Sequence, residues 1–256
     1  MEGFQVYPVK GLPLIACGDD LVDLTLKALE EEGLPLLEGD ILVYASKLIS
    51  KAEGRVVDAR KVKASSRAKA LAAGLGRPAG FVQLVLDESL KVLGVWGRSL
   101  IVLDRRGMVC VNAGVDKSNV EGEHSYCLLP SKPYSSARRL LQRLKAASGI
   151  NRLGVVIADS TTRPFRRGLI HYALAYAGII GVRDYRGTKD LYGRTLRFKV
   201  SSVADELACT AGLAMGEAAE KTGAALIRGL DRLTTSDWEA ERLTVERLED
   251  IYYGMM

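Results

Sequence analysis

The chain has 256 residues, of which 48% are hydrophobic and 26% charged, and it has a net charge of +5 with a pI near 9.0. This composition predicts a globular protein and excludes a disordered chain, and no apolar run reaches the roughly 18 residues of a membrane-spanning helix. Residues 1–4 lack the basic and apolar regions of a secretory signal, so we expect a cytoplasmic protein.

The predicted elements of the first half alternate between strands and helices. Gly33 is expected to end the first helix, which Asp19 or Asp20 caps, and Pro78 is expected to open another. Apolar spacing and turn residues predict strands at residues 4–9 and 41–45 and helices at 20–32, 65–75 and 78 to about 93.

The second half shows the same alternation. Two strands are expected around the turn at residues 104–107, and Ser135 or Ser136 is expected to cap a basic helix. The remaining pattern predicts strands at residues 99–103, 108–115, 153–158 and 194–200, and helices ending near 147, from 203 to about 217, and from 236 towards 253. The fold class is therefore α/β, or mixed α+β.

Metal-binding nitrogen and sulfur ligands are sparse in the sequence. The chain has two histidines, His124 and His171, and four cysteines without a close pair. This excludes a zinc knuckle and a disulfide framework. Any bound metal should therefore be a hard, oxygen-bound ion such as Mg²⁺ or Mn²⁺.

The basic charge favours an anionic partner. The basic residues are spread along the chain, and aromatic residues total 6% without alternating with them, which is untypical of nucleic-acid-binding surfaces. A small polyanion fits better, although a basic nucleic-acid-binding protein stays an alternative. Asparagine and glutamine, three of each, are scarce, which indicates a heat-adapted source.

Two predicted strands end on an aspartate. Asp116 is followed closely by Asn119, and Asp159 is followed by Ser160. Oxygen ligands at strand ends are typical sites for a metal ion that bridges phosphates. The alternative is that both aspartates only form turns.

Cations follow two of the strands and could bind phosphate. They are Lys47, Lys51 and Arg55 after one strand, and Arg163, Arg166 and Arg167 after the other. A solvated basic surface is the alternative. The chain contains neither a P-loop motif nor a Rossmann glycine motif, so a nucleotide would be bound in another way. Helical periodicity leaves open whether Glu206 or Glu217 belongs to such a site.

Several motifs in order along the chain resemble the coenzyme F-420 γ-glutamyl ligase family. The resemblance extends from about residue 6 to residue 230. The motifs are Lys10-Gly-Leu-Pro-Leu-Ile15, Gly18-Asp-Asp-Leu21, Gly39-Asp-Ile-Leu-Val43, Ser46-Lys-Leu-Ile-Ser-Lys-Ala-Glu-Gly-Arg55, Val109-Cys-Val-Asn-Ala-Gly-Val-Asp-Lys-Ser-Asn-Val120, Arg163-Pro-Phe-Arg166, Asp184-Tyr-Arg-Gly187, Val203-Ala-Asp-Glu-Leu-Ala208 and Met215-Gly-Glu217.

The resemblance implies a GTP-dependent ligase that joins L-glutamate to the glutamate-free deazaflavin precursor, and we hypothesise that the reaction passes through an acyl phosphate. It also implies two divalent ions, Mg²⁺ or Mn²⁺, together with K⁺. The implied metal ligands are Asp116, Asp159, Ser160 and Glu217. The implied nucleotide contacts are Leu12, Pro13, Leu14, Ile15, Ser46, Lys47, Lys51, Asn119, Met215 and Gly216. Within the hypothesised mechanism, we expect Lys51 and Arg163 to be the cationic catalytic residues.

The resemblance further implies a two-domain α/β subunit and a homodimer. We expect one functional unit over residues 1–256, with interlocked parts of roughly 1–80 plus 201–256, and 81–200. Alternative functions are a metal-dependent phosphatase or nucleotidyl transferase, which would use the same carboxylates, and a related ligase with another phosphorylated acid as acceptor. Thr162 departs from the glycine or asparagine that the resemblance leads us to expect before Arg163.

Overall fold

The main structural element is a five-stranded sheet. The computed structural model describes residues 3–236, 240, 242–245 and 250. The strand order is β1 (Gln5–Pro8), β12 (Ala224–Arg228), β2 (Ile41–Ala45), β8 (Gly154–Thr161) and β9 (Ile170–Ala177). Within this sheet β2 and β8 pair in parallel, whereas the other neighbours are antiparallel. The carboxyl ends of β2 and β8 therefore lie side by side.

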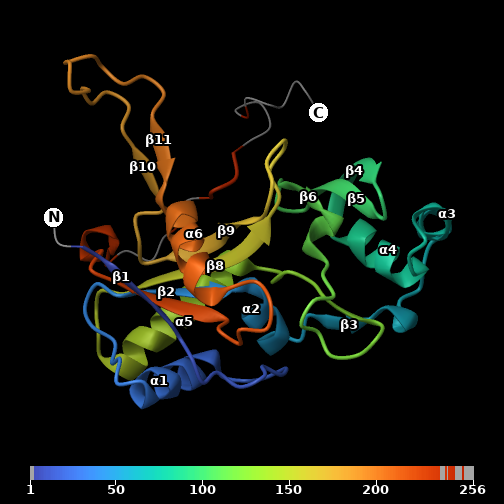
Figure 1. The fold of residues 1–256 in the computed structure, drawn as a ribbon, viewed down its shortest axis with the longest axis horizontal. Helices are drawn as coiled ribbons and strands as arrows, with labels where there is room; N and C mark the ends of the chain where they lie inside the picture. Colours follow the sequence, from blue (N-terminus) through green and yellow to red (C-terminus); the bar gives the residue numbers. More distant parts are fainter. Residues whose placement is uncertain (1–2, 237–239, 241, 246–249, 251–256) are drawn as a thin grey trace.

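Helices cover both faces of this sheet (Figure 1). Helix α6 (Val203–Met215) packs on one face with Val43 and Val156, and helices α1 (Leu21–Glu31) and α5 (Pro133–Ser148) pack on the other with Tyr44 and Ile157. Because both faces are buried, β2 and the first half of β8 are continuous apolar runs rather than alternating ones.

Two helix starts show how local chemistry fixes the elements. The Asp20 carboxylate accepts hydrogen bonds from the backbone N–H of Val22 and Asp23 and caps α1, as predicted. Helix α5 begins at Pro133, before the predicted caps at Ser135 and Ser136. Proline suits the first helical turn because its missing N–H would have no partner there.

A smaller unit forms the right-hand side of Figure 1. Its helices and strands share one hydrophobic cluster, to which Phe81, Leu100 and Val102 belong. It comprises α3 (Ser66–Leu75), α4 (Ala79–Asp87), and the three-stranded sheet β4 (Ser89–Trp96), β5 (Ser99–Asp104) and β6 (Val109–Val111). Strands β3 (Val56–Asp58) and β7 (Ser125–Cys127) pair where the chain enters and leaves this unit.

A hairpin arm extends away from the five-stranded sheet (Figure 1). Its base is formed by β10 (Val182–Asp184) and β11 (Val200–Ser202), which pair antiparallel. Large apolar side chains are exposed along its loop. Leu191 is fully exposed, and Tyr192 and Phe198 are almost fully exposed. Such an arm has little to pack against within its own subunit.

Several predicted elements differ from the structure. The helix opened by Pro78 ends at Asp87 instead of about residue 93, and β4 follows directly. The strand predicted at 108–115 ends at Val111, where a 3-10 turn begins. The strand predicted at 194–200 is wrong except for its last residue, because residues 194–199 lie in the loop of the arm.

The periodicity gave no indication of strands β3, β4, β7 and β12 or of helix α2 (Ser46–Ala52), and it gave no bounds for strands β9 and β10. Most of the helix expected from 236 towards 253 falls on residues outside the described ranges.

The five-stranded sheet crosses the predicted division of the chain. It takes β1, β2 and β12 from one predicted part and β8 and β9 from the other. The separate hydrophobic cluster of the smaller unit instead draws its buried members from residues 59–128. No helix in the described part of the chain is long and apolar enough to cross a membrane.

Candidate functional site

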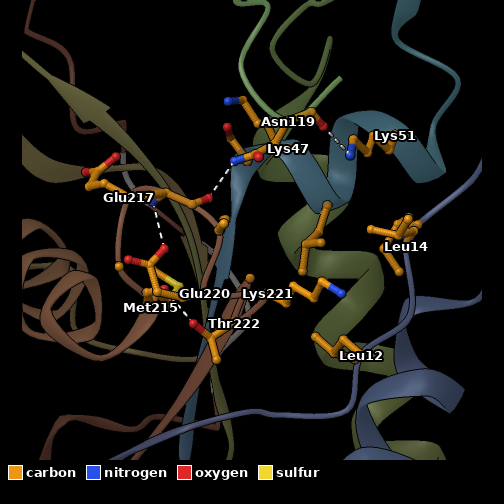
Figure 2. Close-up of a pocket in the computed structure, with 18 of the residues that line it drawn as sticks. Leu12, Leu14, Lys47, Lys51, Asn119, Met215, Glu217, Glu220, Lys221 and Thr222 are labelled. Carbon is orange, nitrogen blue, oxygen red and sulfur yellow. Dashed lines mark hydrogen bonds between the residues drawn. The ribbon is translucent and has the colours of Figure 1, made fainter. Parts of the chain in front are cut away.

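A cavity of about 510 Å³ opens where β2 and β8 end. Because these strands are parallel, Ser46 and Asp159 reach the same edge of the sheet. Figure 2 shows Leu12 and Leu14 on one side of the cavity, and Glu217, Glu220 and Thr222 on the other. The lining residues are 12–15, 45–48, 51, 119–121, 158–160, 171 and 215–223.

Two lysines of α2 contact the loop that contains Asp116. Lys47 Nζ donates to Asp116 Oδ2 at 2.5 Å and also to the Ser118 hydroxyl, and Lys51 Nζ donates to the backbone oxygen of Asn119 at 2.7 Å. Burial raises the pKa of Asp116, but the hydrogen bonds from Lys47 and Ser118 outweigh burial and hold that pKa below its ordinary value. Asp116 is therefore a carboxylate that already has a cationic partner.

Asn119 connects the same loop to the segment after α6. Its side-chain Nδ2 donates to the backbone oxygen of Ala218 at 2.9 Å. Glu220 Oε2 accepts from the backbone N–H of Ala218 at 2.7 Å, and Thr222 Oγ1 donates to the backbone oxygen of Met215 at 2.5 Å (Figure 2). The wall formed by residues 215–223 is thus held by Asn119 and by hydrogen bonds within the segment itself.

Replacing Asn119 should loosen this wall. Its φ of +54° lies in the left-handed region, so Asn119→Ala loses the hydrogen bond to Ala218 and also strains the backbone. Asn119→Gly loses only the hydrogen bond, worth about 1 kcal/mol. We expect a lower melting temperature in thermal unfolding for both variants, with the larger loss in Asn119→Ala. Equal losses would contradict a role for the backbone conformation.

Asp159 is the most perturbed carboxylate of the cavity. It is half-buried, and Ser46 Oγ donates to its Oδ1 at 3.0 Å. Burial raises the pKa of Asp159 to about 6, although the Ser46 hydrogen bond and the charges of Arg106 and Lys47 act in the opposite direction. A carboxylate that is this poorly compensated is suited to a cation.

Arg106 lies in the segment 104–107, for which the sequence predicted only a turn and no role near the cavity. Its Nε donates to Asp104 at 2.9 Å, and Asp104 is only 2% exposed. Its Nη1 is buried and has no hydrogen-bond partner among the described residues. The tip of the β5–β6 hairpin thereby brings a fixed positive charge close enough to affect the pKa of both Asp159 and Tyr172.

His171 and Glu217 meet at the wall of the cavity. His171 Nε2 lies 3.6 Å from Glu217 Oε1, and both residues line the cavity. Glu206 instead accepts a hydrogen bond from Ser201 Oγ at 2.6 Å and is not among the lining residues. Of the two glutamates left open by periodicity, Glu217 therefore faces the cavity.

The structure brings most of the predicted site residues together. All predicted nucleotide contacts line the cavity, as do Asp159, Ser160 and Glu217. Asp116 lies one hydrogen bond away through Lys47. Arg163 does not line the cavity; it lies in the β8–β9 loop, and its Nε is buried without a hydrogen-bond partner among the described residues.

The predicted metal ligands do not form a closed cage. Over residues 3–236 and the few described after them, no group of three or more histidine, cysteine, aspartate or glutamate side chains is close enough to hold a metal. The available oxygen donors come from Asp159 and Ser160 on β8 and from Glu217 after α6. Such an open arrangement suits an ion that takes its other ligands from a substrate or from water.

Known proteins share this sequence over most of its length. Residues 11–229 match the model of the family described as F420-0:Gamma-glutamyl ligase. The chain is 46% identical over 227 residues to the Coenzyme F420:L-glutamate ligase of Archaeoglobus fulgidus, an alignment that covers 89% of this chain and 88% of the relative.

Two further relatives have the same printed name. The protein of Methanothermobacter thermautotrophicus is 40% identical over 227 residues, which is 89% of each chain, and that of Methanopyrus kandleri is 38% identical over 233 residues, which is 90% of each chain. These matches confirm the resemblance inferred from the motifs. The protein is a member of the F420-0:gamma-glutamyl ligase family.

Proposed function

We propose that this protein is a GTP-dependent ligase that joins L-glutamate to the terminal carboxylate of the glutamate-free deazaflavin cofactor. Its relatives are named as ligases of coenzyme F-420 and L-glutamate. The observation that supports the proposal best is the meeting of Lys47, Lys51 and Asp159 at one cavity edge. Phosphoryl transfer requires such positive charges together with a carboxylate that can hold a metal ion.

The nucleotide is proposed to occupy the 510 Å³ cavity. Leu12 and Leu14 would offer apolar contacts to the base, and Lys47 and Lys51 of α2, which also line the cavity (Figure 2), would face the phosphates. Lysine acts on phosphates as a point charge and needs no glycine-rich loop. This arrangement agrees with the lack of a P-loop motif in the sequence.

The residues fit a divalent cation at the edge of the cavity. Asp159 is a half-buried carboxylate whose charge is poorly compensated, and hard ions prefer such oxygen ligands. Asp159, Ser160 and Glu217 would hold the ions, with Asp116 joining if Lys47 turns towards a phosphate. Mg²⁺ or Mn²⁺, assisted by K⁺, would neutralise the negative charge of the phosphates.

The reaction is proposed to proceed in two displacements. An oxygen of the acceptor carboxylate attacks the γ-phosphorus, the bond to GDP breaks, and an acyl phosphate forms. The glutamate amine then attacks the acyl carbon, phosphate leaves, and the amine loses a proton. Lys47 and Lys51 would hold the transferred phosphoryl group. Arg163, which lies in the β8–β9 loop outside the cavity, stays a predicted additional cation.

Product analysis tests the proposal. The protein is incubated with the deazaflavin precursor, glutamate, GTP and Mn²⁺, and the mass of the cofactor is followed. We expect a gain of glutamate, with GDP and phosphate formed only when both co-substrates are present. Steady GTP hydrolysis without them would instead support a phosphatase, and retention on DNA with a steep salt dependence would support a nucleic-acid-binding protein.

A homodimer is part of the proposal, and the arm is the surface that supports it. Leu191, Tyr192 and Phe198 are at least 87% exposed, and a second copy of the chain could cover them. We expect the wild-type protein to sediment as a dimer and the double variant Leu191→Glu/Phe198→Glu as a monomer. A monomeric wild-type protein would contradict the proposal, as would a variant that stays dimeric.

A further inference from the structure

His171 lies beside two of the proposed metal ligands but had no role in the sequence analysis. It is on β9, and in the sheet register it pairs with Ser160 of β8. Its side chain is 13% exposed and lines the cavity. Its Nε2 is 3.6 Å from Oε1 of Glu217, which follows α6. Three polar groups from three elements therefore converge here.

The distance between the two side chains fits ligands of a single ion. Two ligand atoms that each lie about 2.1 Å from one ion are roughly 3.0–3.6 Å apart when the bond angle is about 90–120°. The separation of 3.6 Å between His171 Nε2 and Glu217 Oε1 is within this span. It is too long for a strong direct hydrogen bond.

Helix α6 fixes the imidazole ring in this orientation. Gly212 faces the ring, and a Cβ atom at this position would lie 2.1 Å from His171 Nδ1. The backbone oxygen of His171 also accepts a hydrogen bond from Cys209 Sγ at 2.9 Å. The ring thus packs with one edge against α6, and Nε2 is the nitrogen that meets Glu217.

We propose that His171 Nε2 is a ligand of the divalent ion, together with Glu217 and Ser160. This inference rests on the proposed function, because the ion is the one that the ligase reaction requires. Mg²⁺ strongly prefers oxygen ligands, whereas imidazole suits transition metals. A mixed nitrogen and oxygen ligand set therefore makes the protein prefer Mn²⁺ over Mg²⁺.

Two variants separate the ligand role from simple packing. His171→Asn keeps a polar side chain and removes the imidazole nitrogen. Gly212→Ala keeps His171 but places a Cβ atom where the ring now lies. Gly74→Ala is the matched control, since Gly74 is also in a helix and a Cβ there would meet nothing within 4 Å.

The test measures ion binding to the full chain in the presence of GDP. Pulsed electron paramagnetic resonance of Mn²⁺ should show nitrogen coupling in the wild type and in Gly74→Ala, and none in His171→Asn. Calorimetry should show that the ratio of Mn²⁺ to Mg²⁺ affinity falls roughly tenfold in His171→Asn and Gly212→Ala. Gly74→Ala should keep the wild-type ratio.

Two outcomes would overturn the inference. Wild-type protein that binds Mn²⁺ without nitrogen coupling excludes His171 as a ligand, and so does an unchanged affinity ratio in His171→Asn. Either outcome leaves the ligase reaction itself intact if glutamate is still added to the acceptor. Wild-type protein that binds no divalent ion would overturn the metal site of the proposed function along with this inference.

Discussion

Asp159→Asn should give a protein that is more stable than the wild type above pH 7 and that has lost its activity. Burial raises the pKa of Asp159 from 3.8 to about 6, so its charged form is unfavourable in the folded protein. Removing that charge should increase the free energy of unfolding by roughly 2–3 kcal/mol. Activity should be lost because the carboxylate is the proposed ligand of the divalent ion.

The pH dependence distinguishes this cause from improved packing. Between pH 4 and 6 the folded state binds more protons at Asp159 than the unfolded state, so the stability of the wild type falls as pH rises through this window. Thermal unfolding should show the advantage of Asp159→Asn at pH 8 and none at pH 3.5. Asp184→Asn, on the exposed arm, is the control and should show no such gain. An equal gain at both pH values would contradict the explanation.

Lys47→Met should reduce kcat/KM for GTP by about 100- to 1,000-fold, the range typical of removing one group that stabilises transition-state charge. The substitution removes a proposed phosphate contact and leaves Asp116 without its partner at 2.5 Å. The loss of stability should be about 1 kcal/mol or less, because the pair is partly exposed to water. Steady-state kinetics and thermal unfolding measure the two effects separately.

The control for this variant is Lys69→Met, which removes an exposed lysine of α3 outside the cavity. It should keep wild-type kinetics.

The effect on stability also depends on pH. Lys47 lowers the pKa of Asp116, so the ion pair stabilises the folded protein above the ordinary pKa of an aspartate. This stabilisation is lost as the pH falls and Asp116 is protonated. Lys47→Met and the wild type should therefore converge in stability in acid. A kcat/KM unchanged in Lys47→Met would exclude Lys47 from the phosphate site.

Local sequence determines some of these elements and not others. Strand β2 was predicted to the residue, because an apolar run that is buried on both faces has a clear start and end. The helix from Pro78 was extended too far because apolar residues continue past Asp87, and the turn into β4 depends on pairing with β5. Tertiary contacts override local preference there.

The residue types of the site were predictable, but their pairing was not. The cations after β2 and Asp116 after β6 were recognised from their positions beyond predicted strands. Asp159 was expected just after a strand that ends at Ala158, but it lies within β8, which continues to Thr161. That Lys47 meets Asp116, 69 residues away in the sequence, depends on how the smaller unit folds back onto the sheet. His171 and Arg106 gave no signal, since a single histidine and a turn arginine have no spacing pattern to recognise.

The position of β12 has a consequence for how the protein is made. This strand lies between β1 and β2, although it is the last strand in the described part of the chain. Its two neighbours are synthesised first and cannot pair with it until residues 224–228 leave the ribosome. Because these contacts join distant parts of the sequence, we expect slow folding, and truncation before Ala224 should prevent the sheet from forming.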